Sequence, residues 1–402
     1  MVAVTLADIE AAREVQQDLV VTTPLEESRW LSERVGAQVH LKCENLQRAG
    51  SFKVRGAYVR MSRLSTGERA NGVVAASAGN HAQGVALAAQ HLGIRATVFM
   101  PIGAPIPKEK ATRGYGADVR FVGHTIDEAL VAAKAFAVET GAVLVHPFDH
   151  EDIVAGQGTC GLEILEQCPE VKTIVVSLGG GGLLAGIATA VKALRPDVRV
   201  VGVQAEKAAA YPASLAAGHP VPVAEMATMA DGIAVGCPGE VPFAAIAEKV
   251  DEVVTVSEDS LSKALLMLLE RAKMVVEPAG AAAVAALMDT PEAFDGPVVA
   301  VLSGGNIDPV LLMSVMRHGM ASAGRYLSIR VHIPDRPGGL AKLLNQLADA
   351  GANVLDVAHA RTSAQLHLDE VEVLVQLETR GPEHCDAVLT QLRDAGYPLT
   401  LT

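Results

Sequence analysis

The sequence predicts an α/β body followed by a smaller α+β module, and three observations support this prediction. Short runs rich in valine and isoleucine alternate with amphipathic, alanine-rich stretches through most of the chain, which is typical of parallel strands covered by helices on both faces. Glycine-rich loops directly follow several of these runs. The last part of the chain instead has the order strand-helix-strand-strand-helix-strand, which is typical of a ferredoxin-like fold.

Within the body, each predicted strand leads into a loop and then a helix. The run "GVVAAS" precedes "HAQGVALAAQHLG", and "KTIVVS" leads through "LGGGG" into "LLAGIATAVKAL". The same strand-then-loop form recurs in "RATVFMP", "ADVRFVG", "DVRVVGVQAE" and "GPVVAVLSGGN". Continuous apolar strands separated by helices predict a doubly wound, mostly parallel sheet.

The pattern changes near residue 323, where "ASAGR" indicates a short linker. Beyond it, the predicted strands are "YLSIRVHI", "NVLDVAHAR", "LHLDEVEVLVQLET" and "PLTLT", and the predicted helices are "GGLAKLLNQLADAG" and "EHCDAVLTQLRDAG". We therefore expect two domains, one over residues 1–322 and one over residues 326–402.

Composition and charge exclude several classes of protein. The formal net charge of −13 argues against nucleic acid as a partner, because phosphate backbones are bound by clustered lysine and arginine. No apolar run approaches the ~20 residues of a membrane span, and the N-terminus lacks the basic-then-apolar pattern of a secretion signal. The five cysteines are scattered and never spaced as CxxC, which favours reduced thiols over disulfides or a structural zinc site. We expect a cytoplasmic protein without a membrane partner.

The stretch "SFKVRGAY" contains a candidate reactive amine. Lys53 follows an aromatic residue in a turn flanked by Gly50 and Gly56. A lysine in a loop is most often a solvated charge. Here the apolar surroundings on one side leave a second interpretation open, because desolvation would lower the pKa of the amine and make it available as a nucleophile or base.

Three glycine-rich or polar loops follow predicted strands. "SLGGGGLLAG" can cradle a phosphate with backbone N–H groups at a helix N-terminus. "SAGNHAQG" offers polar donors at a second helix start, although serine and asparagine are also ordinary capping residues. "LSGGN" is the third such loop. Since ligands of open α/β sheets bind beyond the carboxyl ends of the strands, the three loops predict one crevice.

The glycine loop also permits a different cofactor. Gly180, Gly182 and Ala185 satisfy the dinucleotide fingerprint G-x-G-x-x-A, and Glu206 on the next predicted strand could accept a ribose hydroxyl. A nicotinamide-dependent oxidoreductase is therefore an alternative. It leaves Lys53 and the other two loops without a role.

Taken together, "GSFKVRGA", "SAGNHAQGVA", "GGGGL" and "LSGGN", in this order, resemble the threonine/serine dehydratases of the pyridoxal-phosphate fold type II family. The resemblance covers roughly residues 20–322, including "TPLEES", "GQGTCGLEIL" and "EPAGAAAVAAL". It implies two doubly wound subdomains that bind pyridoxal 5'-phosphate. The module at 326–402, with "IPDRPGGLAKLL", resembles the ACT domain, a regulatory amino-acid-binding fold.

The resemblance also implies residue roles. Lys53 would be the catalytic residue, binding the cofactor covalently and, once displaced by substrate, taking the α-proton. Phe52 would pack by the cofactor ring, Asn80 would meet its phenolic oxygen, and Ser303 would face its pyridine nitrogen. The cofactor phosphate would be bound by Gly179, Gly180, Gly181, Gly182 and Leu183. The substrate carboxylate would be lined by Ser77, Ala78, Gly79, Asn80 and His81.

In the ACT-like module, the resemblance implies that isoleucine or valine binds between paired modules. The residues concerned are Asp335, Gly338, Gly339, Leu340 and Asn353, the last reaching the ligand from a neighbouring copy. A homodimer or homotetramer is therefore expected. No metal is expected, because Gln204, Glu206 and the alanines around Ala210 are a poor set of ligands for a divalent cation.

The implied activity is deamination of L-threonine to 2-oxobutanoate and ammonia, with L-serine, which would give pyruvate, as a poorer substrate. Racemases of this group carry a second serine where this chain has Ala78, which has no proton to give. The sequence leaves threonine and serine open, because one methyl group in a pocket is worth only ~1–3 kcal/mol. A β-replacement enzyme of the same fold and a non-enzymatic amino-acid sensor are the remaining alternatives.

Overall fold

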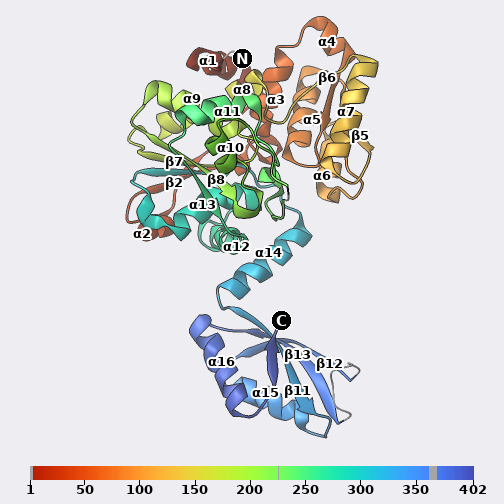
Figure 1. Cartoon of the computed structure of the whole chain (residues 1–402), viewed down its shortest axis with the longest axis vertical. Helices are drawn as coiled ribbons and strands as arrows, with labels where there is room; N and C mark the ends of the chain where they lie inside the picture. The colour runs from red at the N-terminus through yellow and green to blue at the C-terminus, as the bar shows by residue number, and fades with distance from the viewer. Residues whose placement is uncertain (1–2, 225, 362–368) are drawn as a thin grey trace. The chain divides into compact units, whose positions relative to one another are not determined.

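The computed structural model describes residues 3–224, 226–361 and 369–402 (Figure 1). The chain forms two compact units, Met1–Leu311 and Leu312–Thr402, and α14 (Pro309–Ser322) spans the boundary in the sequence. None of the helices in the described part of the chain has the length and apolar character that a bilayer crossing requires.

The first unit contains two sheets. The larger has the strand order β1 (Leu25–Glu27), β2 (Val39–Lys42), β10 (Val298–Val301), β7 (Thr173–Ser177), β8 (Arg199–Ala205) and β9 (Glu252–Val256). All of its neighbouring strands are parallel except β1 and β2. The smaller sheet is parallel throughout, in the order β5 (Asp118–Phe121), β4 (Ala96–Met100), β3 (Val73–Ala76) and β6 (Val143–Leu144).

Helices cover both faces of each sheet. On the smaller sheet, one apolar core joins β3 and β4 to α3 (Lys53–Ser62) and α5 (Asn80–Leu92), and another joins them to α7 (Ile126–Thr140). On the larger sheet, α8 (Glu151–Gln167), α9 (Gly182–Leu194) and α11 (Glu240–Lys249) share a core with β7, β8 and β10. The remaining helices of the unit are α1 (Leu6–Gln16), α2 (Arg29–Val35), α4 (Thr66–Asn71), α6 (Ile106–Gly114), α10 (Tyr211–Ala217), α12 (Glu258–Met267) and α13 (Pro278–Asp289).

The second unit is the expected β-α-β-β-α-β module. Its antiparallel sheet has the order β12 (Asn353–Ala360), β13 (Glu370–Glu378), β11 (Tyr326–Pro334) and β14 (Leu399–Leu401), with α15 (Gly339–Asp349) and α16 (Pro382–Asp394). Alternate residues of β11 and β13 are buried in one core with the two helices. Residues 366–368 of the predicted strand before β13 lie outside the described residues.

Helix starts in the first unit differ in how their first N–H groups are capped. The helices α1, α4 and α7 begin with capping boxes, made by Thr5, Ser65 and Thr125 with an acidic residue three positions later. In contrast, α5 and α9 begin after Gly79 and Gly181, and neither has a side-chain cap. The first N–H groups of a helix lack intrahelical partners, so these two ends can bind an anion.

Glycines allow α3 and α8 to pack backbone against backbone. A Cβ atom added at Gly156 of α8 would lie 2.7 Å from the carbonyl oxygen of Arg55 and 2.7 Å from the Cα of Gly56, both on α3. Because these neighbours are backbone atoms, no side-chain rotation can relieve the overlap. The glycine therefore determines how closely the helix that begins at Lys53 approaches α8.

We predict that Gly156→Ala lowers the free energy of unfolding by about 1–3 kcal/mol through overpacking. The matched control is Gly67→Ala on α4, where an added Cβ would meet nothing within 4 Å, and where alanine is expected to stabilise by about 0.4–1 kcal/mol. Chemical denaturation of both variants measures the difference. Equal stabilities would contradict close packing at Gly156.

Candidate active site

One cavity of about 790 Å³ in the first unit brings together the three loops and the lysine that the sequence singled out. Its wall contains every residue predicted for cofactor and substrate binding: Phe52, Lys53, Ser77, Ala78, Gly79, Asn80, His81, Gly179, Gly180, Gly181, Gly182, Leu183 and Ser303. The loops follow β3, β7 and β10, so the crevice lies beyond the carboxyl ends of parallel strands from both sheets.

Lys53 is the first residue of α3 and lies, partly buried, in the cavity wall. The Nζ atom donates to the carbonyl oxygen of Pro147 at 3.0 Å and lies 5.1 Å from the centroid of the Phe52 ring. Burial lowers the pKa of Lys53 to about 8, although the nearby Glu277 carboxylate raises it. A much larger share of the amine is therefore unprotonated near neutral pH than for an ordinary lysine, which suits a nucleophile or a general base.

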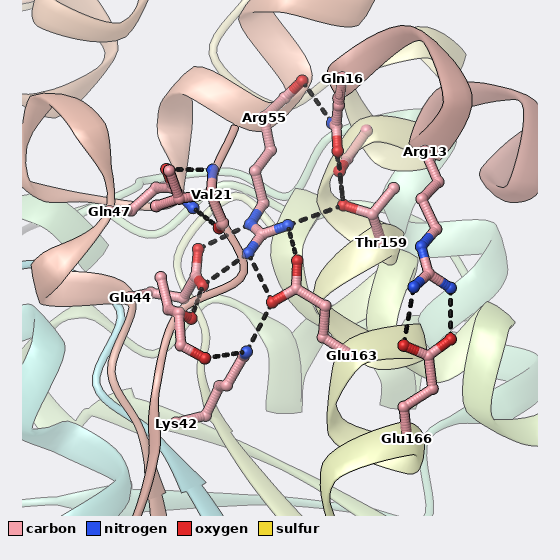
Figure 2. Close-up of polar contacts among 12 residues, drawn as sticks. Arg13, Gln16, Val21, Lys42, Glu44, Gln47, Arg55, Thr159, Glu163 and Glu166 are labelled. Carbon is pink, nitrogen blue, oxygen red and sulfur yellow. Dashed lines mark hydrogen bonds and ion pairs between the residues drawn. The ribbon is translucent and has the colours of Figure 1, made fainter. Parts of the chain in front are cut away.

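A buried cluster of charges surrounds Arg55, which lies two residues after Lys53 on α3 (Figure 2). The Arg55 guanidinium donates to both carboxylate oxygens of Glu44, at 2.7 and 2.8 Å, and to both of Glu163, at 2.7 and 3.0 Å. It also donates to the Thr159 hydroxyl, and Lys42 forms an ion pair with Glu163. Two positive and two negative side chains thus neutralise each other, and α3 is bound to α8 and to the segment after β2.

Two histidines of the cavity wall are neutral. The ring of His81 hydrogen-bonds the carbonyl oxygen of Val145 at 2.8 Å, which requires a proton on Nε2, and burial lowers the pKa of His81 to about 3. His146 accepts the backbone N–H of Asp149 at Nδ1, and burial lowers its pKa to about 4. The His81 ring is thus bound to the protein backbone, so a contact of this residue with a substrate carboxylate would have to come from its own backbone.

The glycine loop after β7 is tightly enclosed. A Cβ atom at Gly180 would lie 2.3 Å from the Phe148 ring, and one at Gly181 would lie 2.0 Å from the Tyr211 hydroxyl. The φ angle of Gly181 is +102°, which residues with a side chain rarely adopt. Only glycine fits these positions, and the loop presents its backbone to the cavity at the uncapped start of α9.

Several cavity residues were not predicted. Glu277 precedes α13 and is almost fully buried, and burial, together with Asp231, raises its pKa to about 7. Lys108 of α6 is also buried and donates to Asp231 at 2.6 Å. The motif "EPAGAAAVAAL" contained Glu277, but a single acidic residue before an alanine-rich helix gave no sign that it faces the cavity. Glu206, the possible ribose acceptor, is exposed and outside the cavity wall.

The second unit has a smaller pocket of about 310 Å³ near the start of α15. Of the residues predicted to bind an effector, Asp335, Gly338 and Leu340 line this pocket, whereas Gly339 and Asn353 do not. Asn353 donates to Glu378 at the opposite end of the sheet, so it does not reach the pocket of its own module. Three residues that were not predicted also line the pocket: Arg336, His359 and Arg361. Arg361 donates to Asp335 at 3.1 Å.

Two known protein families together match most of the chain. The family described as "Pyridoxal-phosphate dependent enzyme" matches residues 17–304, and the chain belongs to it. The ACT domain family matches residues 327–394. The fold type II body and the C-terminal ACT domain are thereby confirmed, and the nicotinamide alternative is wrong.

The relatives are more specific. The chain is 45% identical over 398 residues, 99% of both chains, to the L-threonine ammonia-lyase of Thermotoga maritima. It is 46% identical over 390 residues, 97% of both chains, to the enzyme of the same name from Geobacter sulfurreducens. Among solved structures, the processed form of threonine deaminase isoform 2 from Solanum lycopersicum is 39% identical, with a TM-score of 0.74, over 78% of this chain and 92% of that one.

The cavity fits pyridoxal phosphate in three respects. The glycine loop and the uncapped start of α9 offer backbone donors for a phosphate. Lys53 offers an amine with a lowered pKa for a covalent link. Ser177, in the wall beside the glycine loop, is buried, and no partner for its hydroxyl lies among the described residues. A buried hydroxyl without a partner is rare in proteins unless a ligand or water binds it.

We predict that Arg55→Met destabilises the protein by about 3–5 kcal/mol at neutral pH, because it leaves two buried carboxylates without their shared cation. Burial alone raises the pKa of Glu44. The charge and hydrogen bonds of Arg55, together with Lys42 and Thr23, outweigh burial and hold this pKa below its usual value. Without Arg55, the pKa of Glu44 in the folded state rises above its value in the unfolded state. The variant therefore loses the most stability at neutral pH, and the loss becomes smaller as acidification protonates the buried carboxyl groups.

Denaturation of Arg55→Met at neutral pH and at mildly acidic pH measures both effects. Arg48→Met, at an exposed position nearby, is the matched control and should stay within about 0.5 kcal/mol of the parent. A loss for Arg55→Met as small as that of the control would contradict the role of the cluster.

Proposed function

We propose that this chain is a threonine ammonia-lyase that converts L-threonine to 2-oxobutanoate and ammonia, and that it accepts L-serine less well, giving pyruvate. The observation that carries the proposal is an amine of lowered pKa, Lys53, in one cavity with a phosphate-type glycine loop and a polar helix start. Relatives named L-threonine ammonia-lyase that align with almost the whole chain support the same reaction.

In this proposal each part of the cavity has one task. Pyridoxal phosphate, when bound, supplies an electron sink for the bond that loses the α-proton. The Lys53 amine takes that proton, and the backbone of the loop Ser77–Gly79 together with the start of α5 binds the substrate carboxylate. The Ser303 hydroxyl, which keeps a pyridine nitrogen only weakly protonated, favours prompt loss of the β-hydroxyl. At Ala78 no side chain can return a proton to Cα, which favours elimination over racemisation.

We further propose that residues 1–322 form the catalytic domain and residues 326–402 an ACT regulatory domain that binds isoleucine or valine. Asp335, Gly338 and Leu340 line a pocket next to the uncapped start of α15, which can bind an amino-acid carboxylate. Gly339 belongs to the same helix start, and Asn353 would contribute from a second copy. Such a site requires paired modules, so we propose a homodimer or homotetramer in the cytoplasm.

We predict that Lys53→Ala abolishes both the covalently bound cofactor, seen as its visible absorption band, and threonine deamination. Lys53→Arg should be equally inactive, because its guanidinium stays protonated and cannot act as a base. Lys110→Ala, on α6 and outside the cavity wall, is the matched control. Deamination by Lys53→Ala within tenfold of the parent would show that another group does the chemistry.

We also predict that isoleucine or valine binds the full chain and changes the apparent affinity for threonine by about 5- to 150-fold. Calorimetry on the full chain measures binding, and steady-state kinetics measure the coupling. Leu340→Arg should abolish both responses. Leu355→Arg is the control, on β12 and 52% exposed outside the pocket. Binding that survives in Leu340→Arg would place the effector site elsewhere.

A further inference from the structure

The segment that leads to Lys53 is hydrogen-bonded along the loop after β10. The backbone N–H of Phe52 donates to the carbonyl of Ser303 at 3.2 Å, and that of Gly305 donates to the carbonyl of Gly50 at 2.9 Å. The side chain of Asn306 then donates to the carbonyl of Ala49 at 2.7 Å. The motif "LSGGN" therefore does more than supply Ser303: its loop also binds the segment that precedes Lys53. Its last residue, Asn306, has no role assigned so far.

Ala49 is held in an unusual backbone conformation. Its φ and ψ angles are 60° and 15°, in the left-handed region, and Lys273 is the only other non-glycine residue with positive φ among the described residues. Such a conformation is unfavourable for an alanine and persists only where surrounding contacts impose it. It is the Ala49 carbonyl that accepts the Asn306 side chain.

Asn306 fixes the orientation of a second amide. A backbone carbonyl can only accept, so the Asn306 atom facing Ala49 must be Nδ2. The same Nδ2 lies 2.9 Å from the side chain of Asn80. That neighbour must therefore be the acceptor Oδ1, because two NH₂ groups cannot hydrogen-bond each other. The direction of the Ala49 carbonyl thus determines which way the Asn80 amide faces.

Glu277 imposes the same orientation from the other side. The Nδ2 atom of Asn80 donates to Oε1 of Glu277. No donor for the other oxygen, Oε2, lies within the described residues, so a proton taken up by this carboxyl can reside on Oε2 while Oε1 continues to accept. Asn80 therefore keeps one orientation whether or not Glu277 is protonated. Of its two N–H groups, one is bound to Glu277 and one remains for the cavity that Asn80 lines.

We propose that Asn306 and Glu277 are positioning residues that hold the Asn80 amide with a single N–H directed at the phenolic oxygen of the cofactor. The inference rests on the proposed function, which assigns Asn80 to that oxygen. If the amide were reversed, Oδ1 would face the phenolic oxygen and repel it. Fixing the amide before the cofactor binds replaces that repulsion with a hydrogen bond, and no reorientation is needed on binding.

The test compares Asn80→Ala, Asn306→Ala and the double variant by titrating each full chain with pyridoxal phosphate. Each single variant should shift the visible absorption band of the bound cofactor and raise its dissociation constant roughly tenfold, as expected for loss of a hydrogen bond to a charged group. Because Asn306 acts through Asn80, the double variant should match Asn80→Ala instead of adding the two effects.

Three further variants separate orientation from structural damage. Glu277→Ala should reproduce the spectral shift, whereas Glu277→Gln, which keeps an acceptor oxygen, should restore the band. Asn45→Ala removes a buried amide of the same region, which donates to the Val275 carbonyl at 3.2 Å, and should leave the band unchanged. Thermal unfolding is recorded for every variant. If Asn306→Ala fails to fold, the Glu277 pair tests the claim from the other side of Asn80.

The failures are distinguishable. A parent chain that binds no pyridoxal phosphate would overturn the proposed function and this inference with it. A parent that binds normally, together with an Asn306→Ala variant of parental spectrum and affinity, would overturn the inference alone. Additive shifts in the double variant would also overturn it, because Asn306 would then act independently of Asn80.

Discussion

The buried ion cluster of Arg55, Glu44, Glu163 and Lys42 is the constraint on which the active site depends. Arg55 lies two residues after Lys53 on α3, and its guanidinium binds carboxylates from two other parts of the chain. A buried guanidinium is stable only where carboxylates meet it with good geometry. The ion pairs of Arg55 therefore fix the position of the start of α3. Because Lys53 is the first residue of that helix, they also keep its amine at the cavity wall, although Lys53 is not itself part of the cluster.

Positions without a side chain, or without a side-chain cap, determine the shape of the rest of the cavity. Gly156 lets α3 approach α8 closely, and Gly180 and Gly181 let the phosphate-type loop fit against Phe148 and Tyr211. Both helices that open onto the cavity, α5 and α9, begin without a side-chain cap. The first N–H groups of these two helices therefore have no side-chain acceptor, and a ligand in the cavity can supply one.

The sequence predicted the parts of the site that depend on local pattern. Strand runs followed by glycine loops indicated a crevice at the carboxyl ends of parallel strands, and the lysine between glycines lies in the wall of this cavity. Contacts between segments that are distant in the sequence could not be predicted, because no local pattern of residues indicates them. The bond from Asn306 to Asn80 joins residues 226 positions apart, and Arg55 meets Glu163 from 108 positions away. His81 was predicted to line the substrate carboxylate. Its ring hydrogen-bonds the Val145 carbonyl, a contact that the sequence could not indicate, because a histidine beside a helix start looks the same in sequence whichever way its ring turns.

The central claim is that Lys53, and no other amine, carries the cofactor. Two other lysines could carry the cofactor instead: Lys108, which also lines the cavity, and Lys42, which belongs to the buried ion cluster. The most direct measurement is to load the full chain with pyridoxal phosphate, fix the covalent link by borohydride reduction, and map the modified peptide by mass spectrometry. We expect the added mass of the reduced cofactor on the peptide that contains Lys53. Modification of Lys108 or Lys42, or no modification of a chain that binds the cofactor, would contradict it.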